Sequence, residues 1–286
     1  MRRSKRLLFF GVPALVALAI GFAIWIGRKD DSLERVRSAG VLRIGYAIEA
    51  PFAMIGPDGR ITGESPETAR EIAKRLGVAR TEWVQLRFEA LIPDLRDRRL
   101  DVIAAGLFVT KERARKVRFS DPTVRVAPGL LVLRGNPQRL GSFESLTAGS
   151  NAKVAVLAGS VEEERLRARG WDGEKLVVVP DAQAGRAALA QGIVDAIALS
   201  LPTLRWIAKS SRGSYEVLAD PPKRNAAGAD FVAFAFHPAD AALQRAWNGA
   251  QSEFIGSPEH LRTISRFGFE ASNLAADVHT SEVLRK

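Results

Sequence analysis

Two charged residues in this chain stand where they could bind the two ends of a small zwitterion. Arg113 follows the predicted strand 100–105 and its loop, and its guanidinium can hold a carboxylate through two parallel hydrogen bonds, which a lysine cannot do. Glu49 lies in the loop after the predicted strand 41–46, where its carboxylate can accept a hydrogen bond from a cationic N–H group. A zwitterion taken out of water needs a partner of each sign, because unpaired buried charges are costly.

Three phenylalanines, Phe52, Phe88 and Phe108, follow predicted strand ends, at the edge where α/β sheets bind ligands. Phenyl rings around a delocalised cation contribute about 0.5–2 kcal/mol each through cation–π attraction. Pro51 restricts the loop that carries Phe52. Gly106 ends the strand that precedes Phe108, and we include it with the three rings in the predicted ligand site.

Ser160 and Val161 begin a predicted helix, residues 162–169, directly after a predicted strand at 153–157. The Ser160 hydroxyl and the Val161 amide could donate hydrogen bonds to the carboxylate that Arg113 holds, aided by the positive field at the helix N-terminus. Ser160 could equally serve only as the N-cap of this helix.

The other candidates also have purely structural interpretations. Arg113 could be a solvated helix arginine, and Glu49 could be an acid of a surface loop. The three phenylalanines could be core residues. The sequence around them, described below, favours the binding interpretation.

Composition excludes several other kinds of site. The 286-residue chain has no cysteine, which excludes disulfides, thiolate metal sites, thiol catalysis and a lipidated N-terminal cysteine. Its three histidines, His237, His260 and His279, lie far apart without metal-ligand spacing. We therefore expect no metal, no cofactor and no catalytic residue.

The formal net charge of +10 does not indicate nucleic-acid binding. Six of the 42 Lys and Arg residues lie in residues 1–29, which contain no acidic residue. The remainder has 36 basic residues against 32 acidic ones, without a basic stripe or interleaved aromatic residues.

Residues 1–29 are typical of an export signal peptide or a membrane anchor. A basic start at 2–6 precedes an uncharged apolar run at 7–27, which is followed by Arg28 and Lys29. This run is long for a signal-peptide core and about right for one membrane span, so we favour an uncleaved anchor over a cleaved signal. In either case we expect the body of the protein outside the cytoplasm, tethered to the membrane by residues 7–27 if the segment is not cleaved.

The chain after this segment alternates predicted strands and helices. After a polar linker at 30–40, the first series has strands at 41–46, 83–86 and 100–105 and helices at 66–76 and 88–99. The second series has strands at 153–157, 176–179 and 196–199 and helices at 162–169 and 182–191. Such alternation predicts α/β architecture, with two mostly parallel sheets that helices cover on both faces.

Two further strands, at 124–133 and 231–236, are predicted to cross between the two series. A chain that crosses twice makes one lobe discontinuous and creates a hinge that can close on a ligand. The last helices, at 239–254 and 258–267, would then pack on the first lobe. The predicted division is lobe 1 at 41–126 and 229–277, lobe 2 at 127–228, and a tail at 278–286.

Two motifs resemble the signature of the family-3 solute-binding proteins of ABC importers. They are DVIAAGLFVTKER at 101–113 and VRFSDP at 117–122. In that family a strand and loop lead to Thr-x-x-Arg at the start of a helix, and Phe-Ser-x-Pro precedes the hinge. The resemblance extends over roughly residues 38–277 and implies the type II, Venus-flytrap fold of periplasmic binding proteins.

Within this family the chain resembles the branch that binds ectoine and hydroxyectoine. The similar segments are GYAIEAPF at 45–52, FEALIP at 88–93, AAGLF at 104–108 and FIGSPEHL at 254–261. Amino-acid binders of the family usually carry an aromatic residue at the position of Glu49 and an Asp that pairs with the ligand ammonium. When the chain is aligned on Asp195-Ala196, the position of that Asp falls at Ser200. This departure argues against a plain α-amino acid and moves the positive end of the ligand towards Glu49.

The resemblance implies a non-enzymatic, monomeric binding protein that captures a small zwitterion and docks on ABC permease subunits. A polar amino acid or an opine is the alternative ligand. A dehydratase or a lobe pair of a cell-wall lytic enzyme is the second class, but Glu49 is the one carboxylate placed in the cleft and no histidine accompanies it. A membrane-anchored sensor is the third class, and no cytoplasmic signalling domain follows the basic start.

Overall fold

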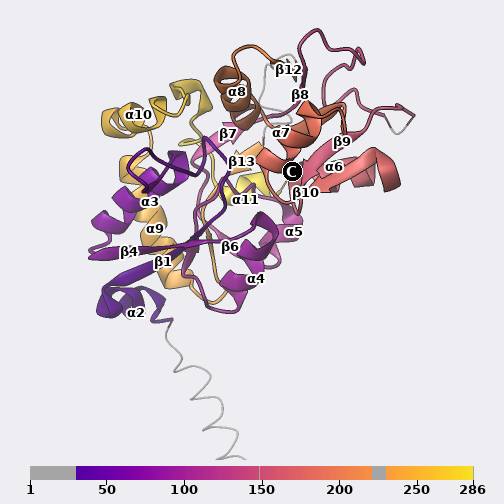
Figure 1. Cartoon of the computed structure of the whole chain (residues 1–286). Coiled ribbons are helices and arrows are strands. Elements are labelled where there is room, and N and C mark those ends of the chain that lie inside the picture. The colour runs from indigo at the N-terminus through magenta and orange to yellow at the C-terminus, as the bar shows by residue number, and fades with distance from the viewer. Residues whose placement is uncertain (1–29, 148, 221–229, 286) are drawn as a thin grey trace, which may run out of the picture.

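Two five-stranded sheets organise this chain in its computed structural model, which describes residues 30–147, 149–220 and 230–285 (Figure 1). The predicted signal peptide or anchor at 1–29 lies outside these residues. In the part of the chain that is described, no helix has the length and apolar character needed to span a membrane.

The first sheet has the strand order β4-β1-β5-β14-β6. Its strands are β1 (Val41–Tyr46), β4 (Arg80–Gln85), β5 (Val102–Ile103), β6 (Arg118–Phe119) and β14 (Ala235–Phe236). β1 pairs in parallel with β4 and β5, whereas β14 pairs antiparallel with both β5 and β6. Four strands therefore run in one direction, and only β14 opposes them.

Helices cover both faces of the first sheet. They are α2 (Ser32–Ala39), α3 (Glu64–Arg75), α4 (Leu91–Arg96), α5 (Lys111–Ala114), α9 (Ala241–Phe254) and α10 (Pro258–Ser265). On one face Ile72 of α3 and Trp247 of α9 are completely buried in a cluster with Leu42 and Ile44 of β1. On the other face Leu91 and Leu95 of α4 pack in a cluster with Leu100 and Ile103.

The second sheet has the strand order β10-β9-β11-β8-β12. Its strands are β8 (Pro128–Leu133), β9 (Val154–Leu157), β10 (Leu176–Val179), β11 (Ala196–Ser200) and β12 (Tyr215–Ala219). β9 lies between β10 and β11 in parallel, and β8 is antiparallel to both of its neighbours. Again four strands run one way and one opposes them, which agrees with the prediction of mostly parallel sheets.

The second sheet is also covered on both faces. Its helices are α6 (Val161–Ala168), α7 (Ala182–Ala190) and α8 (Leu201–Ser210), with a 3₁₀ turn at Gly173–Lys175. Val154 and Val156 of β9 pack in one cluster with Leu166 of α6, while Ala155 and Leu157 join the cluster that contains α7 and α8. This alternation follows from the two-residue period of a strand.

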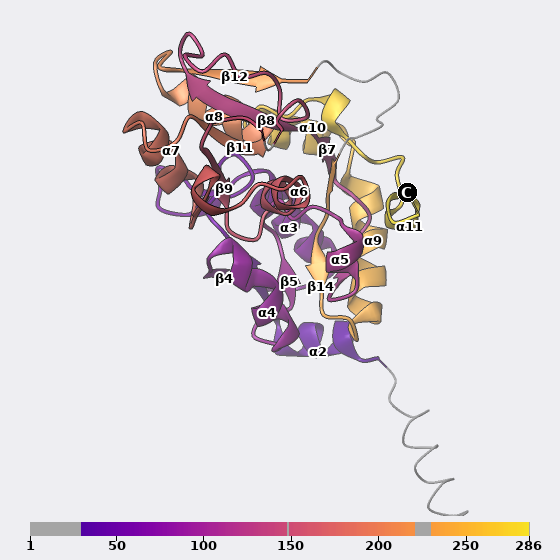
Figure 2. The ribbon, with the colours of Figure 1, turned by 90° about the vertical axis from the view of Figure 1, so that its right-hand side faces the viewer.

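Both antiparallel strands come from the two predicted crossovers. Each crossover is split into two strands, β7 (Val124–Val126) followed by β8, and β13 (Asp230–Val232) followed by β14. β7 and β13 pair antiparallel with each other between the two sheets. The elements of the second sheet lie together above those of the first, with this pair joining them (Figure 2). We propose the division into lobe 1 (41–126 and 229–277) and lobe 2 (127–228) and use these names below.

Several predicted boundaries differ from the structure. The segment 30–40, predicted as a linker, contains α2, because Val36 is buried against the core beside α9. The predicted helix 88–99 is a 3₁₀ turn at Phe88–Ala90 followed by α4, and the predicted strand 100–105 is reduced to β5. A β2–β3 hairpin (Met54–Ile55, Ile61–Thr62) lies between β1 and α3.

The C-terminal tail also carries ordered structure. After a 3₁₀ turn at Ala271–Asn273, it ends in α11 (Thr280–Val283). The Thr280 N–H donates to Asp121 Oδ1 over 3.0 Å, which ties this end to the loop before the hinge. The tail therefore packs on lobe 1.

Candidate functional site

At the predicted site, two hydrogen bonds join a lobe-1 side chain to lobe 2. The Thr203 hydroxyl of α8 donates to Glu49 Oε1 over 2.7 Å, and the Arg113 Nη2 group of α5 donates to the Gly159 carbonyl over 2.9 Å. Glu49 and Arg113 come from lobe 1, while Thr203 and Gly159 come from lobe 2. The lobes are therefore closed on each other at the predicted site.

A small cavity of about 20 Å³ is enclosed between the lobes here. Its lining consists of Glu49, Phe88, Gly106, Phe108, Arg113, Leu157, Ser160, Val161, Glu162, Leu199 and Ser200. Eight of the nine residues predicted from the sequence are in this set, which omits Phe52. The enclosed space is about that of one water molecule, so a larger ligand can enter only if the lobes move apart.

Arg113 is held by its own short helix and by backbone carbonyls. Thr110 is the N-cap of α5, and its hydroxyl accepts from the Arg113 N–H over 3.1 Å. The Arg113 Nη1 group donates to the Phe108 carbonyl over 3.0 Å, and the guanidinium carbon lies 5.5 Å from the centre of the Phe88 ring. Burial lowers the pKa of Arg113, which is 7% exposed, and the Glu162 and Glu164 carboxylates act in the opposite direction.

Glu49 lies at the end of lobe 1 that faces lobe 2, just after β1. Glu49 and Ala53 exchange two backbone hydrogen bonds of 2.9 and 3.0 Å, which closes the loop between them. The side chain is 9% exposed, and burial raises the pKa of its carboxyl above the usual range. The hydrogen bond from Thr203 and the charge of Arg113 oppose this shift. The Glu49 carboxyl and the Arg113 guanidinium are thus both buried at the same cavity.

Phe52, the ninth predicted site residue, does not line this cavity. Phe52 is 1% exposed and packs against Phe269, with 5.4 Å between ring centres. Its ring lies behind Gly106, close enough that a Cβ on that glycine would be 2.7 Å from the ring. Gly106 therefore separates Phe52 from the cavity, and Phe88 and Phe108 are the aromatic residues that line it.

Gly106 meets two requirements that exclude a side chain. Its φ of +64° lies in the left-handed region, and a Cβ would lie 2.7 Å from the Phe52 ring. We expect Gly106→Ala to lower the free energy of unfolding by about 1–3 kcal/mol, measured by urea denaturation, because it combines backbone strain with a clash against Phe52.

Gly59→Ala is a matched control for this substitution. Gly59 has a similar φ of +75°, but a Cβ there would have no heavy atom within 4 Å. A loss of stability no larger than that of Gly59→Ala would show that the contact with Phe52 is not tight.

Ser160 and Val161 lie at the start of α6 on the lobe-2 side of the cavity. The Ser160 hydroxyl accepts from the Glu163 N–H over 3.1 Å and is the N-cap of the helix. The structural alternative for Ser160 is thus correct, although its hydroxyl hydrogen is not used in that bond. Both residues also line the cavity, so capping the helix leaves Ser160 at the candidate site.

Ser200 ends β11 and is buried within lobe 2. Its hydroxyl donates to Thr203 Oγ1 over 3.1 Å, and Thr203 in turn donates to Glu49. Ser200 is thus linked to Glu49 of lobe 1 by two hydrogen bonds through the Thr203 hydroxyl. Thr203 was not identified from the sequence, although it lies in the first turn of the helix that follows Ser200.

Sequence reasoning also missed Leu157, Leu199 and Glu162 in the cavity lining. Leu157 is the last residue of β9 and Leu199 the last but one of β11, and both provide apolar surface. Glu162 is 3% exposed, and burial raises the pKa of its carboxyl to about 8. Its signal was the run Glu162-Glu163-Glu164, which is also what a helix N-terminus favours and therefore did not point to a site.

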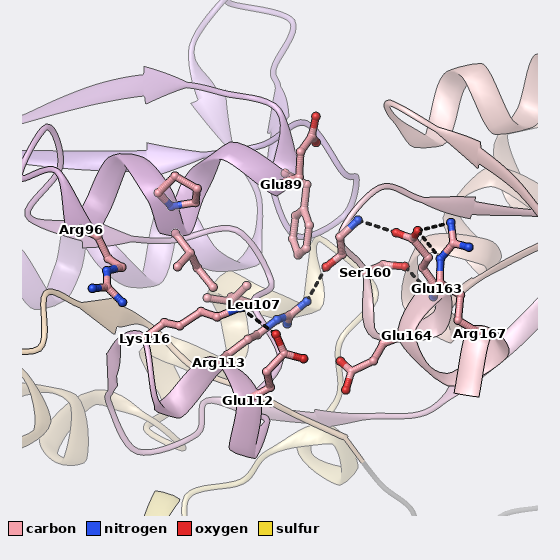
Figure 3. Close-up of a pocket in the computed structure, with 14 residues that line it drawn as sticks. Glu89, Arg96, Leu107, Glu112, Arg113, Lys116, Ser160, Glu163, Glu164 and Arg167 are labelled. Atoms are coloured by element: carbon pink, nitrogen blue, oxygen red, sulfur yellow. Dashed lines mark hydrogen bonds and ion pairs between the residues drawn. The ribbon is translucent and has the colours of Figure 1, made fainter. Parts of the chain in front are cut away.

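A larger pocket of about 500 Å³ adjoins the cavity and shares Phe88, Arg113 and Ser160 with it. Figure 3 shows Arg113 between its two sides, with Glu112 and Lys116 on one and Glu163 and Arg167 on the other. These flanking charges are paired, Lys116 with Glu112 at 2.7 Å and Arg167 with Glu163 at 2.8 Å. The pocket is a charged, open approach to the buried site. Among the described residues, no group of three or more His, Asp or Glu side chains could hold a metal ion.

Comparisons with known proteins identify the family of this chain. Residues 42–268 match the family model of the bacterial extracellular solute-binding proteins, family 3. A probable amino-acid ABC transporter periplasmic-binding protein of Sinorhizobium fredii is 30% identical over 250 residues, which cover 86% of this chain and 82% of that protein.

The crystal structure of EhuB in complex with hydroxyectoine is a structural relative with a TM-score of 0.80 and 32% sequence identity. The similarity covers 90% of this chain and 98% of EhuB. It confirms the predicted type II binding-protein fold with two crossovers at the hinge.

One relative is named as an enzyme, the membrane-bound lytic murein transglycosylase F of Vibrio cholerae. It is 36% identical over 141 residues, which cover 49% of this chain but only 26% of the transglycosylase. The match concerns a part of that longer protein. The family model, in contrast, spans both lobes and the hinge of the present chain, which therefore belongs to the bacterial extracellular solute-binding proteins of family 3.

Proposed function

We propose that this protein captures ectoine or hydroxyectoine between its lobes and delivers it to the permease of an ABC uptake system. The observation that carries the proposal is the pairing of Arg113 and Glu49, both buried, on one cavity lined by Phe88 and Phe108. Ectoine is a cyclic amidinium that carries a carboxylate, so it needs one group of each sign and rings around a delocalised cation.

Capture proceeds by lobe closure. In the open protein, Arg113 takes the ligand carboxylate through its two-pronged guanidinium, and Glu49 accepts from an amidinium N–H. Closure brings the Ser160 hydroxyl and the Val161 amide to the same carboxylate. The Thr203 hydroxyl, which now donates to Glu49, shares that carboxylate with the ligand. The closed form is the one that the permease recognises.

The ligand class has support from two directions. EhuB, which resembles this chain over nearly its whole length, was crystallised with hydroxyectoine. At the position expected for the ammonium-binding Asp of amino-acid binders, this chain has Ser200, whose hydroxyl is directed to Thr203.

A polar amino acid or an opine is the second candidate ligand. The Sinorhizobium fredii relative is named as a probable amino-acid transporter component. The buried Glu162 carboxyl of lobe 2 favours this candidate, because it could replace the acid missing at Ser200.

We further propose a non-enzymatic, monomeric periplasmic protein without metal or cofactor, tethered to the inner membrane by residues 7–27. Glu49 and Glu162, whose pKa values burial raises, could act as acid or base in a dehydratase. Turnover of prephenate or arogenate by the purified protein would contradict the binding assignment.

Calorimetric titration of the purified chain tests the proposal. The panel contains ectoine, hydroxyectoine, glycine betaine, arginine, glutamine and an opine. Micromolar or tighter binding of ectoine, alone or with hydroxyectoine, is expected. Tight binding of an amino acid or an opine alone would overturn the proposed ligand and leave the family and the transport class intact.

A further inference from the structure

Glu162 is a buried acid that the proposed ligand contacts do not use. It is the second residue of α6, lines the cavity between the lobes, and is 3% exposed. The hydrogen-bond donor to its carboxylate is its own backbone N–H. A carboxyl group so deeply buried ordinarily has a cationic partner or several donors.

Two cations lie near Glu162, Arg165 and Arg113, and both are hydrogen-bonded to other groups. Arg165, one turn along α6, is engaged by Asp230 of β13 through a hydrogen bond of 2.8 Å from Nη1 to Oδ2. Arg113 of α5 donates to the Phe108 and Gly159 carbonyls. Glu49 of lobe 1 faces the same cavity and repels a negative charge on Glu162. The cavity lining thus has two carboxyl groups and one guanidinium.

A ligand carboxylate on Arg113 would use the one positive side chain of this lining. Glu49 and Glu162 would both remain for the ligand cation, one from each lobe. Two acids on opposite walls can both be satisfied only by a cation that has N–H groups in two directions.

We propose that Glu162 is a second anionic ligand contact, which lobe 2 brings onto the cation that Glu49 holds from lobe 1. The site then selects carboxylate-bearing ligands whose cation carries at least two N–H donors, such as an amidinium, a guanidinium or a primary ammonium. It discriminates against quaternary ammonium ligands such as glycine betaine. This inference rests on the proposed function, since it assigns a further residue of the same site.

Proton release accompanies binding in this arrangement. Burial raises the pKa of Glu162 to about 8, so the carboxyl is mostly protonated at pH 7 until a cation lies beside it. A bound cation favours the ionised form, and the proton leaves to solvent. Because the complex needs the ionised group, affinity falls by about tenfold for each pH unit below about 8 and levels off above that pH.

Calorimetry in phosphate and in Tris at pH 7 measures both affinity and proton release. The ligands are ectoine, hydroxyectoine, arginine and glycine betaine, and the variants are Glu162→Gln and the control Glu174→Gln. Glu174 is an exposed acid of lobe 2 outside the cavity lining. For ligands with N–H donors, Glu162→Gln is expected to weaken binding roughly 10- to 100-fold and to release about one proton fewer than the wild type. Glu174→Gln is expected to match the wild type.

Glu162→Asp keeps the inference testable if the Gln variant folds poorly. It retains an ionisable acid at a shorter reach, so proton release should persist while affinity falls. Thermal unfolding without ligand checks that each variant is folded.

The possible outcomes separate this inference from the proposed function. If Glu162→Gln matches the wild type in affinity and proton release, Glu162 is not a ligand contact and the proposed function is unaffected. If the wild type binds arginine and not ectoine, and Glu162→Gln weakens arginine binding, the proposed ligand is overturned and Glu162 retains its role. Glycine betaine binding as tightly as ectoine would overturn the selectivity, and failure of the wild type to bind any ligand would overturn both.

Discussion

Arg113→Lys should weaken ligand binding by about 2–5 kcal/mol, which is roughly a 30- to several-thousandfold rise in Kd. The lysine keeps the positive charge but loses the planar fork that can bind both oxygens of a carboxylate. It also loses the cross-lobe hydrogen bond to Gly159 and the bond to the Phe108 carbonyl. Titration calorimetry with ectoine and hydroxyectoine measures the effect.

Arg115→Lys is the matched control for that substitution. Arg115 follows α5 directly and is exposed, so the same chemical change there should leave Kd unaltered. Binding by Arg113→Lys within threefold of the wild type would mean that charge alone holds the ligand. In that case Arg113 would be a structural arginine that joins the lobes.

Glu49→Gln should weaken binding of ectoine by a similar amount, about 2–5 kcal/mol, since the amidinium loses the one lobe-1 carboxylate that faces it. The substitution preserves the shape of the side chain and its ability to accept from Thr203. Calorimetric titration at pH 8 measures the difference in Kd, because the wild-type Glu49 carboxyl is more fully ionised there than at lower pH.

Stability should respond to Glu49→Gln in the opposite direction. Burial raises the pKa of Glu49 in the folded protein. The unfolded chain therefore loses the proton first as pH rises, and the wild type loses stability between its unfolded and folded pKa values. The Gln variant does not titrate, so its melting temperature relative to the wild type should be higher at pH 8 than at pH 4.

A combined result would be decisive for the role of Glu49. Weaker binding together with relatively higher stability at pH 8 identifies a residue kept for ligand rather than for folding. Unchanged affinity in both Glu49→Gln and Phe108→Ala would mean that the acid and the ring do not form the proposed cage. The ligand cation would then lie elsewhere in the cleft.

The closed geometry also explains how ligand binding and lobe closure are coupled. Thr203 and Gly159 of lobe 2 bond to the same two side chains, Glu49 and Arg113, that are proposed to hold the ligand. A ligand that takes over these contacts joins both lobes through itself. The energy of closure therefore depends on how well the ligand satisfies the two charges.

The sequence by itself determined the elements and the end of each sheet at which chemistry could occur. Strands of parallel sheets end at one edge, so Glu49 after β1 and Phe108 after β5 were expected to meet, and both line the cavity. Ser160 and Asp181 cap α6 and α7 as their residue types favour. The crossovers were visible because apolar runs there lie outside the strand–helix alternation.

Only the tertiary structure decided which side chains of these segments enter the site. Phe52 follows the same strand as Glu49, yet its ring packs on Phe269 behind Gly106, because a tight loop can direct neighbouring side chains to opposite sides. The segment at 32–39 is a helix because Val36 packs into the core of lobe 1. The local sequence pattern does not predict this contact.

Glu162 shows most directly why the sequence alone does not identify every side chain that lines the cavity. Glu162, Glu163 and Glu164 are identical in type and adjacent in sequence, and all suit the first turn of a helix. Successive residues of a helix point in directions about 100° apart, and only the docking of lobe 2 on lobe 1 selects the one that faces inward. Glu162 is thereby buried in the cavity wall while Glu164 stays exposed, which alters the charge of the site without any change in the sequence pattern.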